Sequence, residues 1–196
     1  MKKFVKKLVR FFCGEYSIYQ IFMWNAGVDG YVPLGETGNT KVVRIESSAI
    51  ASSPDALIRE QIAYAGTDSF AYACFDGNRI VGVCFYWVAE RYRQRNYWPL
   101  LACDAKLVQI VLLPEMRGRG LARMLIMSSG REMLLQGYQR LFARIWHSNM
   151  PSICAFQNAG WWRKAFVIEI NPMRRSRPFR LCIPTKTRAH AVSFRD

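Results

Sequence analysis

A chain of 196 residues with 51% apolar content is long enough to bury the core of one ordinary domain, and no linker or repeat indicates a second. Its formal net charge of +14 predicts acidic partners, such as a phosphate-bearing cofactor, nucleic acid or anionic lipid, without choosing among them. No apolar run reaches the roughly 18 residues that span a bilayer, and lysines interrupt the first apolar stretch, so we expect neither insertion nor secretion.

The placement of cysteine and histidine argues against a disulfide framework and against a zinc site. The six cysteines form no Cys-x-x-Cys pair and most lie in apolar runs, which is typical of reduced core thiols in a cytosolic protein. The two histidines, His147 and His190, pair with no cysteine at ligand spacing, so we expect no metal. The cysteines are Cys13, Cys74, Cys84, Cys103, Cys154 and Cys182.

Residues 1–12, MKKFVKKLVRFF, combine basic and apolar side chains at helical spacing. On a helix the lysines and Arg10 would share one face and the apolar side chains the other, and Gly14 would end the helix. Such a basic amphipathic helix either lies flat on an anionic membrane or covers its own domain with its charged face in solvent. The sequence leaves both interpretations open.

Hydrophobic periodicity and turn signals predict a mixed sheet with helices on its faces. The turn signal Asp76-Gly77-Asn78 predicts a hairpin. The expected strands cover residues 16–24, 41–46, 70–75, 79–88, 105–113, 140–146, 166–170 and 179–183. The expected helices run from Ser53 to about Ala65, from Gly118 to about Gln136, and from Ser148 or Asn149 to Gly160.

One junction in this pattern predicts a phosphate site. Residues 108–122 read VQIVLLPEMRGRGLA, an apolar strand that passes through a glycine-rich loop directly into a helix. The glycines allow a close approach of the backbone to an anion, and the positive end of the helix favours negative charge there. A Gly-Lys-Ser/Thr triphosphate loop is absent, so a diphosphate is the expected ligand.

Two motifs in this order resemble the GNAT superfamily of N-acetyltransferases. The family loop Gln/Arg-x-x-Gly-x-Gly/Ala is matched by Arg117, Gly120 and Ala122, after the customary Pro114. The family helix Asn-x-x-Ala/Ser-x-x-x-Tyr-x-x-x-Gly-Phe is similar to the segment from Asn149 to Trp161. The resemblance extends over residues 40–183 in the order of the elements.

The resemblance implies an α/β (α+β) fold with a mixed, mostly antiparallel twisted sheet and helices on both faces. It implies an acetyltransferase domain over residues 15–185, between the basic amphipathic helix of residues 1–14 and a basic C-terminal tail of residues 186–196. The protein would be cytoplasmic, with residues 1–12 holding it at the inner membrane face if they bind lipid.

The resemblance also implies that acetyl-coenzyme A donates an acetyl group to a primary amine. Its pantetheine arm would pair with Ile110, Val111 and Leu112, whose alternative role is that of a plain core strand. The N–H group of Leu112 would donate to the thioester carbonyl and stabilise the developing oxyanion. Asn149 would contact the cofactor, cap its helix, or do both. The pyrophosphate would lie on Arg117, Gly118, Arg119, Gly120, Leu121 and Ala122.

The proton-transfer groups depart from the family pattern. Phe156 stands at the family tyrosine, and Lys106 and Val108 stand at common carboxylate positions. His147 is the best remaining catalytic candidate, because its ordinary pKa suits proton transfer near neutral pH, although a histidine that caps the turn explains it as well. Asp104 acts either through water or as a solvated loop carboxylate.

Arg144 is the expected substrate residue, because it stands where some relatives have their base and its guanidinium suits a phosphate or carboxylate on the acceptor. The segment RYRQRNYWP, residues 91–99, either supports this role with guanidinium and aromatic surface or is a solvated basic loop.

Three functions remain open at this point. The leading one is N-acetylation of a small or lipid-linked amine that carries negative charge, such as an amino-sugar precursor. The second is acetylation of a protein or aminoacyl-tRNA amine, for which the positive charge would provide electrostatic capture. The third is binding of coenzyme A without catalysis, since the usual tyrosine and glutamate are missing.

Overall fold

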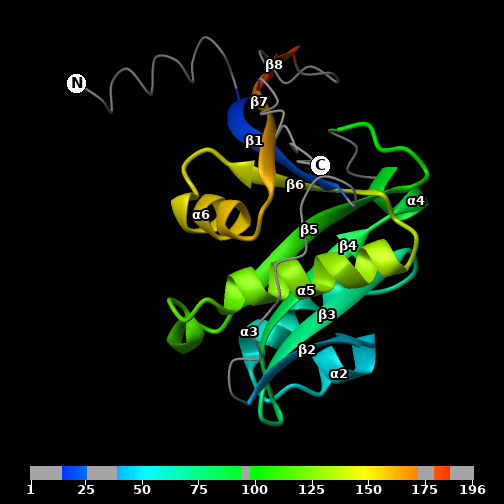
Figure 1. The fold of residues 1–196 in the computed structure, drawn as a ribbon, viewed down its shortest axis with the longest axis vertical. Coiled ribbons are helices and arrows are strands. Elements are labelled where there is room, and N and C mark those ends of the chain that lie inside the picture. The colour runs from blue at the N-terminus through cyan, green and yellow to red at the C-terminus, as the bar shows by residue number, and fades with distance from the viewer. Residues whose placement is uncertain (1–14, 26–38, 94–97, 172–178, 186–196) are drawn as a thin grey trace, which may run out of the picture.

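The structure is a computed structural model, and it describes residues 15–25, 39–93, 98–171 and 179–185 (Figure 1). The helix expected over residues 1–12 and the tail expected over residues 186–196 lie outside the described residues. Within the described ranges, no helix combines the length and apolar character needed to cross a bilayer.

Eight strands and several short helices alternate along the chain, as the periodicity predicts. The strands are β1 (Glu15–Asn25), β2 (Thr40–Ile45), β3 (Ser69–Asp76), β4 (Arg79–Trp87), β5 (Asp104–Leu112), β6 (Arg140–Trp146), β7 (Trp162–Asn171) and β8 (Phe179–Pro184). The helices are α2 (Ser47–Ala51), α3 (Ala56–Arg59), η1 (Glu60–Tyr64), α4 (Ala89–Arg93), η2 (Pro114–Met116), α5 (Leu121–Leu135) and α6 (Met150–Asn158).

All eight strands join one sheet in the order β2-β3-β4-β5-β6-β1-β7-β8. Every neighbouring pair is antiparallel except β5 and β6, so the expected mixed, mostly antiparallel sheet is confirmed. The first strand of the chain lies between two late ones, since Ile21 faces Arg144 of β6 on one side and Ala165 of β7 on the other. The N-terminal strand therefore completes the C-terminal half of the sheet.

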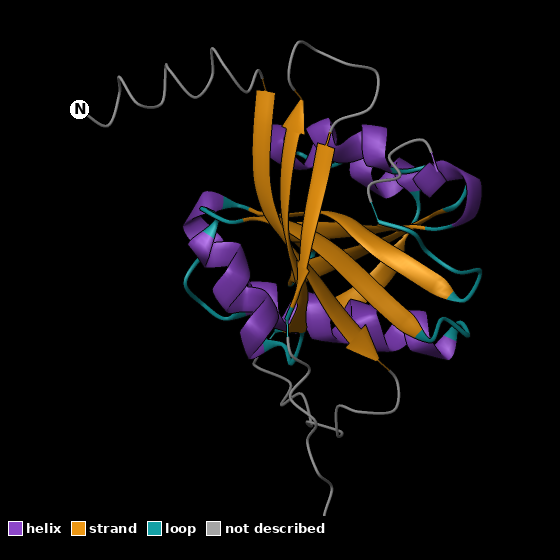
Figure 2. Ribbon diagram, turned by 90° about the horizontal axis from the view of Figure 1, so that it is seen from above, coloured by secondary structure: helices purple, strands orange, loops and turns teal. Residues whose placement is uncertain are grey.

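Helices cover both faces of the sheet, which Figure 2 shows as strands between two groups of helices. Alternate side chains of β4 make this visible, because successive residues of a strand point to opposite faces. Cys84 and Tyr86 contact the hydroxyl of Ser129 in α5. Phe85 and Trp87 on the other face pack against Tyr64 of η1.

The core has two parts, one on each side of the strands that surround β1. The larger cluster includes Phe22, whose ring packs against Phe156 of α6 at a centroid distance of 6.2 Å. The smaller cluster lies on the opposite face and consists of Tyr19, Ile21, Met23, Phe142, Ala165 and Val167. We call that side, away from α5 and α6, the second face of the sheet.

Two local expectations need correction. The segment expected as one helix from Ser53 to Ala65 is the short helix α3 followed by the 3-10 helix η1, because Ser53 lies in the turn between α2 and α3 and its hydroxyl accepts the N–H of Asp55. The region after β4 begins with helix α4, and Arg91 is not a solvated loop residue. Its guanidinium lies over the Trp87 ring and donates to the backbone carbonyls of Ala63, Ala65 and Thr67.

The cysteines follow the expectation of reduced core thiols only in part. Cys74 and Cys84 are buried, and burial raises the pKa of both thiols. Cys154, on α6, and Cys182, on the edge strand β8, are exposed. Within the described ranges, no three His, Cys, Asp or Glu side chains gather in a way that would hold a metal ion.

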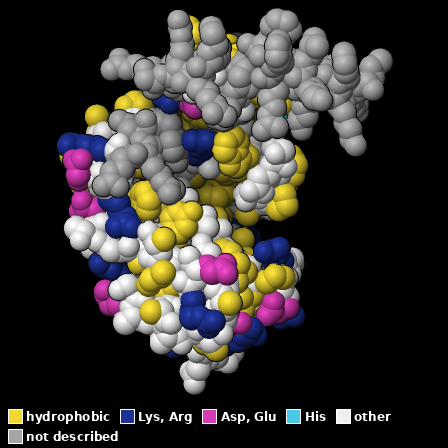
Figure 3. Space-filling model, turned by 180° about the vertical axis from the view of Figure 1, so that it is seen from behind, with side chains coloured by type: hydrophobic (Ala, Val, Ile, Leu, Met, Phe, Trp, Pro, Cys, Tyr) yellow, Lys and Arg dark blue, Asp and Glu magenta, His cyan; other side chains and the backbone are white. Residues whose placement is uncertain are grey.

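The face shown in Figure 3 carries basic side chains at several separate places on its described part. Figure 3 shows basic side chains scattered among apolar and acidic ones on the described part of the face opposite to that of Figure 1.

Candidate functional site

The strands β5 and β6 pair only at their first residues and then separate. The parallel register joins Asp104 to Arg140 and ends where Leu107 faces Ala143. On its other edge β5 stays paired with β4, and Val108 forms an irregularity in that register. The remaining part of β5 thus has a partner on one edge only.

The backbone of this unpaired edge presents its polar groups to the gap. The N–H of Leu113 donates to the carbonyl of Val81 at 2.9 Å, which makes these two residues a hydrogen-bonded pair of the antiparallel ladder. Hydrogen-bonded and non-bonded pairs alternate along such a ladder. The N–H and C=O groups of Leu112 and Ile110 therefore point away from β4, toward the side where β6 has separated.

The loop after β5 has the backbone shape that its glycines predict. Gly118 and Gly120 both have φ of +77°, a conformation that residues with a Cβ adopt only with strain. No heavy atom lies within 4 Å of the Cβ position at either glycine, so the loop is open on that side. Gly120 immediately precedes α5, and no side chain caps the first turn of that helix. Its first N–H groups are consequently available to a ligand.

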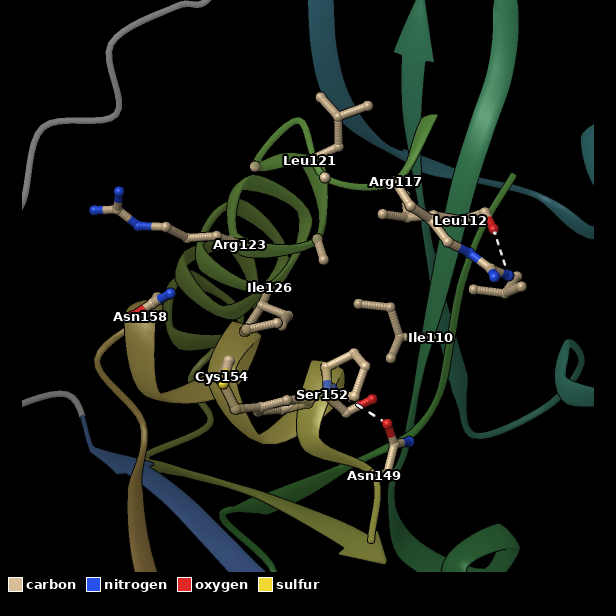
Figure 4. Close-up of a pocket in the computed structure, with 17 residues that line it drawn as sticks. Ile110, Leu112, Arg117, Leu121, Arg123, Ile126, Asn149, Ser152, Cys154 and Asn158 are labelled. Atoms are coloured by element: carbon tan, nitrogen blue, oxygen red, sulfur yellow. Dashed lines mark hydrogen bonds between the residues drawn. The ribbon is translucent and has the colours of Figure 1, made fainter. Parts of the chain in front are cut away.

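A cavity of about 1040 Å³ lies between the end of β5, this loop, the start of α5 and helix α6 (Figure 4). Nine of the ten residues predicted to bind the cofactor line it. They are Ile110, Val111, Leu112, Arg117, Gly118, Gly120, Leu121, Ala122 and Asn149. Arg119, the tenth, is exposed and does not line the cavity.

The remaining lining residues come from the two helices. The sequence predicted no cofactor contact for any of them, although Ser152, Ala155 and Phe156 belong to the motif that begins at Asn149. These lining residues are Arg123, Ile126, Pro151, Ser152, Cys154, Ala155, Phe156 and Asn158. Helical spacing could have found most of them, because residues three and four positions beyond a ligand residue share its face. Ala122 and Ile126 are four apart, and Asn149, Ser152 and Ala155 follow at intervals of three.

Asn149 caps its helix and also lies where it could contact the cofactor. Its side-chain oxygen accepts the N–H of Ser152 at 3.2 Å, so the cap of α6 is confirmed. The same side chain lines the cavity, and Figure 4 shows its amide nitrogen on the side away from Ser152.

Gly82 is a further residue that the sequence did not reveal. A Cβ at this position of β4 would lie 2.2 Å from the Leu112 side chain and 3.0 Å from the Val111 carbonyl oxygen. Only glycine therefore allows Leu112 its present place in the wall of the cavity.

Of the positions considered for proton transfer, His147 and Asp104 lie outside the cavity lining, whereas Phe156 belongs to it. The backbone N–H of His147 donates to the carbonyl of Ile18 at 3.2 Å, and its ring Nδ1 lies 3.1 Å from the same oxygen. This double contact is what a histidine that fixes the turn after β6 would show. Phe156 is buried between Phe22 and Trp161, where no hydroxyl is present.

Asp104 is a buried carboxylate with a structural role. The alternative that the sequence offered, a solvated loop carboxylate, is wrong. Its oxygens accept two 2.7 Å bonds from the Arg140 guanidinium, and one accepts the Leu101 N–H at 2.7 Å. Its side chain is completely buried, because it begins strand β5 beneath this ion pair. A carboxylate held in this way has no open position for an attacking amine.

Cationic and aromatic side chains gather on the second face, near the point where β5 and β6 separate. The Arg144 guanidinium lies 4.1 Å from the centroid of the Tyr19 ring and 4.6 Å from that of Trp146. Lys106 is fully buried and donates to the Tyr92 hydroxyl at 3.3 Å. Burial lowers the pKa of Lys106 well below its usual range, and the charge of Arg144 lowers it further.

The row continues across the sheet to β8. Arg180 pairs with Glu169 at 2.9 Å, and the Tyr19 hydroxyl donates to the same carboxylate at 3.3 Å. Burial raises the pKa of Tyr19 to about 12, so its hydroxyl keeps its proton at neutral pH. Lys106, Arg144 and Arg180 outnumber Glu169 here, so the row is positive when its residues are charged.

The strand order, the glycine loop and the gap between β5 and β6 together give the chain a GNAT-type fold. The model of the Acetyltransferase (GNAT) family matches residues 41–161, so the chain belongs to this family. Comparison with curated proteins yields no significant match.

Solved structures show the same fold at low identity. A GNAT-family acetyltransferase from Colwellia psychrerythraea is 12% identical with a TM-score of 0.56, over 85% of this chain and 60% of its own. A Drosophila protein is 14% identical with a TM-score of 0.54, over 89% and 58%. A putative GNAT acetyltransferase from Novosphingobium aromaticivorans is 18% identical with a TM-score of 0.51, over 80% and 64%. The chain thus spans about three-fifths of the length of these proteins.

Proposed function

We propose that this protein is an acetyl-coenzyme A-dependent N-acetyltransferase that acts on a primary amine. The observation that carries the proposal is the cavity, where an unpaired strand edge, two open glycines with positive φ and an uncapped helix start come together. These features fit a diphosphate joined to an extended amide-containing arm, because they offer clustered N–H donors at one end and a strand edge at the other. When bound, acetyl-coenzyme A supplies the acetyl group as an activated thioester.

In this proposal the backbone does most of the binding. The N–H groups from Arg117 to Ala122 hold the diphosphate, with the Arg117 side chain beside them. Ile110 and Leu112 pair with the pantetheine arm through groups that β4 leaves unused. The N–H of Leu112 is the donor that we assign to the carbonyl oxygen of the thioester. Asn149 contributes its amide nitrogen from the opposite wall.

The acceptor that we propose is an amine that also carries a phosphate or carboxylate. The support comes from the second face, where Arg144 stands on β6 just beyond the point where β5 separates from it. The Arg144 guanidinium lies over both the Tyr19 and the Trp146 ring, contacts that hold it in place and favour recognition of a planar or tetrahedral anion. An amino-sugar precursor, free or linked to a lipid, has this chemistry.

His147 is our candidate for proton transfer, because it follows β6 directly and lies two residues before Asn149. Its contact with Ile18 involves Nδ1, which leaves Nε2 as the nitrogen for this role. The variant His147→Gln tests it. Loss of the acid limb of the pH–rate profile supports proton transfer, whereas an unchanged profile with lower stability supports the turn-fixing role.

Two measurements test the proposed function. Calorimetric titration with acetyl-coenzyme A tests donor binding, and absence of binding at millimolar concentration would refute the proposal. Release of free thiol is then measured with paired acceptors, glucosamine against glucosamine 6-phosphate and an amino acid amide against its free acid. We expect the anionic member of a pair to have the higher kcat/KM, and we expect Arg144→Met to remove that preference.

The other two functions are outcomes of the same assay. Turnover of peptides or aminoacyl-tRNA alone, with steep salt dependence, would favour a macromolecular amine. On the described part of the face that Figure 3 shows, basic side chains are scattered among acidic ones and form no continuous basic track for nucleic acid. Binding of acetyl-coenzyme A without turnover of any amine would favour a binding module, in keeping with Phe156 at the tyrosine position.

A further inference from the structure

The outer strands of the sheet present an apolar surface that belongs to neither buried cluster. On the edge strand β8, Phe179, Leu181 and Ile183 are exposed at 60%, 58% and 47%. Their strand partners on β7 are Ile170, Ile168 and Phe166, all half-buried. Neither cluster contains any of these six side chains, which we call the β7–β8 apolar surface.

The two faces of β8 differ sharply in chemistry. Arg180 lies on the second face, where it pairs with Glu169. The three exposed apolar side chains occupy alternate positions and hence point to the opposite face. Helix α5 packs on strands β2 to β5 of that face, and α6 contacts Phe22 of β1, so within the described ranges these helices do not extend over β8. Contiguous exposed apolar side chains of this kind mark an interaction surface.

The basic N-terminal segment joins the fold beside this surface. Glu15, where β1 begins, pairs with Asn171 of β7, and the neighbouring Ile170 pairs with Phe179. Adjacent strands are about 4.8 Å apart, so the junction of residues 1–14 with β1 is about 10 Å from Phe179. Residues 1–12 contain Lys2, Lys3, Lys6, Lys7 and Arg10 and no acidic residue.

We propose that the β7–β8 apolar surface docks this protein on an anionic lipid bilayer. The sequence just before β1 is rich in lysine, which anionic lipid headgroups attract, and the apolar side chains of the described surface would enter the interface. Charge argues against a second copy as the occupant, since two chains of net charge +14 repel each other. This inference does not depend on the proposed enzymatic function.

Vesicle co-sedimentation of the full chain tests the docking. Vesicles of phosphatidylcholine mixed with phosphatidylglycerol are compared with vesicles of phosphatidylcholine alone, and we expect binding to the anionic ones only. The variant Phe179→Thr/Leu181→Thr/Ile183→Thr should weaken binding by about tenfold or more, because three buried apolar contacts with the interface are lost. Threonine keeps the strand propensity of β8.

The matched control is Cys182→Thr, at an exposed position on the other face of the same strand, and it should bind vesicles like the wild type. Deletion of residues 1–12 should weaken binding and reduce its salt dependence. Circular dichroism and an unchanged midpoint of urea denaturation show that the triple variant folds, and the single variant Leu181→Gln serves if it does not.

Three results would overturn the proposal. The first is that the wild-type chain does not bind anionic vesicles. The second is that the triple variant binds them with the same affinity as the wild type. The third is a concentration-dependent dimer in analytical ultracentrifugation that the triple variant abolishes while vesicle binding stays intact, which would assign the surface to a second copy.

Discussion

Arg117 reaches back to the strand that precedes its own loop, since its Nη2 atom donates to the carbonyl oxygen of Leu112 at 3.4 Å (Figure 4). This bond ties the position of the loop cation to the strand residue whose N–H we assign to the thioester. A shift of Leu112 would therefore move a charge at the diphosphate end of the cavity as well.

The first prediction compares Arg117→Gln with Arg119→Gln. Arg117 lines the cavity and Arg119 does not, although they are two residues apart and have the same charge. Loss of a charge-assisted contact costs about 1.5–3 kcal/mol, so Arg117→Gln should weaken acetyl-coenzyme A binding at least tenfold. Arg119→Gln should change it little. Calorimetry at one ionic strength measures both, and equal losses would mean that only general charge attracts the cofactor.

The second prediction concerns backbone conformation at the loop. Gly120→Ala introduces a Cβ at a φ of +77°, with open space around it, so strain rather than collision opposes the change. We expect a loss of about 1 kcal/mol in the free energy of unfolding and a loss of affinity for acetyl-coenzyme A. Gly137→Ala is the matched control, with φ of +94°, open space and a place at the far end of α5. Gly137→Ala should lower the free energy of unfolding but leave the affinity for acetyl-coenzyme A unchanged.

The third prediction separates structure from catalysis at Asp104. Asp104→Asn breaks an ion pair whose carboxylate is completely buried and whose guanidinium is 37% exposed. Because Arg140 regains some hydration, we expect a loss of about 2–3 kcal/mol in the free energy of unfolding. Urea denaturation measures this loss. Affinity for acetyl-coenzyme A should be unchanged at a temperature where the variant is folded, and a selective loss of kcat would contradict the structural role.

The fourth prediction uses the buried amine of Lys106. Burial lowers the pKa of Lys106 in the folded protein, so the unfolded chain binds the proton more tightly and folding is penalised below the unfolded pKa near 10.5. The free energy of unfolding should therefore increase as the pH rises toward 10.5. Lys106→Met removes the penalty and should stabilise the protein near neutral pH by about 1–3 kcal/mol.

The advantage of Lys106→Met should shrink as the pH approaches 10.5, and this trend distinguishes it from a simple packing effect. Tyr92 keeps its bonds to the backbone of Trp98 in the variant, so no hydroxyl loses all its partners. Lys41→Met, at an exposed lysine of β2, is the control. An advantage that stays constant with pH would contradict a lowered pKa.

Local patterns predicted the elements around the cavity well. The strand at 140–146 has the predicted bounds, and β5 and α5 begin and end within three residues of theirs. These segments carry strong signals, an apolar run before a glycine loop and an Asn-Pro helix start. The helix expected after Ser53 was predicted less well, because its serine lies in a turn that tertiary contacts shape. Helix α4 was not predicted, because it overlaps the start of the basic aromatic segment of residues 91–99, which has little periodicity.

The chemistry beside the cavity was beyond local patterns because it depends on distant partners. Gly82 is needed only because Leu112, thirty positions later, packs against it. From the sequence alone Asp104 resembles a loop carboxylate, because its ion pair with Arg140, thirty-six residues later, is visible only in the fold. The stacking of Arg144 on Tyr19 requires strand β1 beside β6, an order that no hydropathy pattern specifies.

That position of β1 has a consequence for biosynthesis. This strand leaves the ribosome well before its partners β6 and β7, which are made more than a hundred residues later. Until then Tyr19, Ile21 and Phe22, all fully buried in the finished protein, have nothing to pair with in their final register. Pairing across so much chain is slow and leaves apolar strands exposed. We expect nascent chains to need the basic residues before β1, or a chaperone, to stay soluble until the last strands arrive.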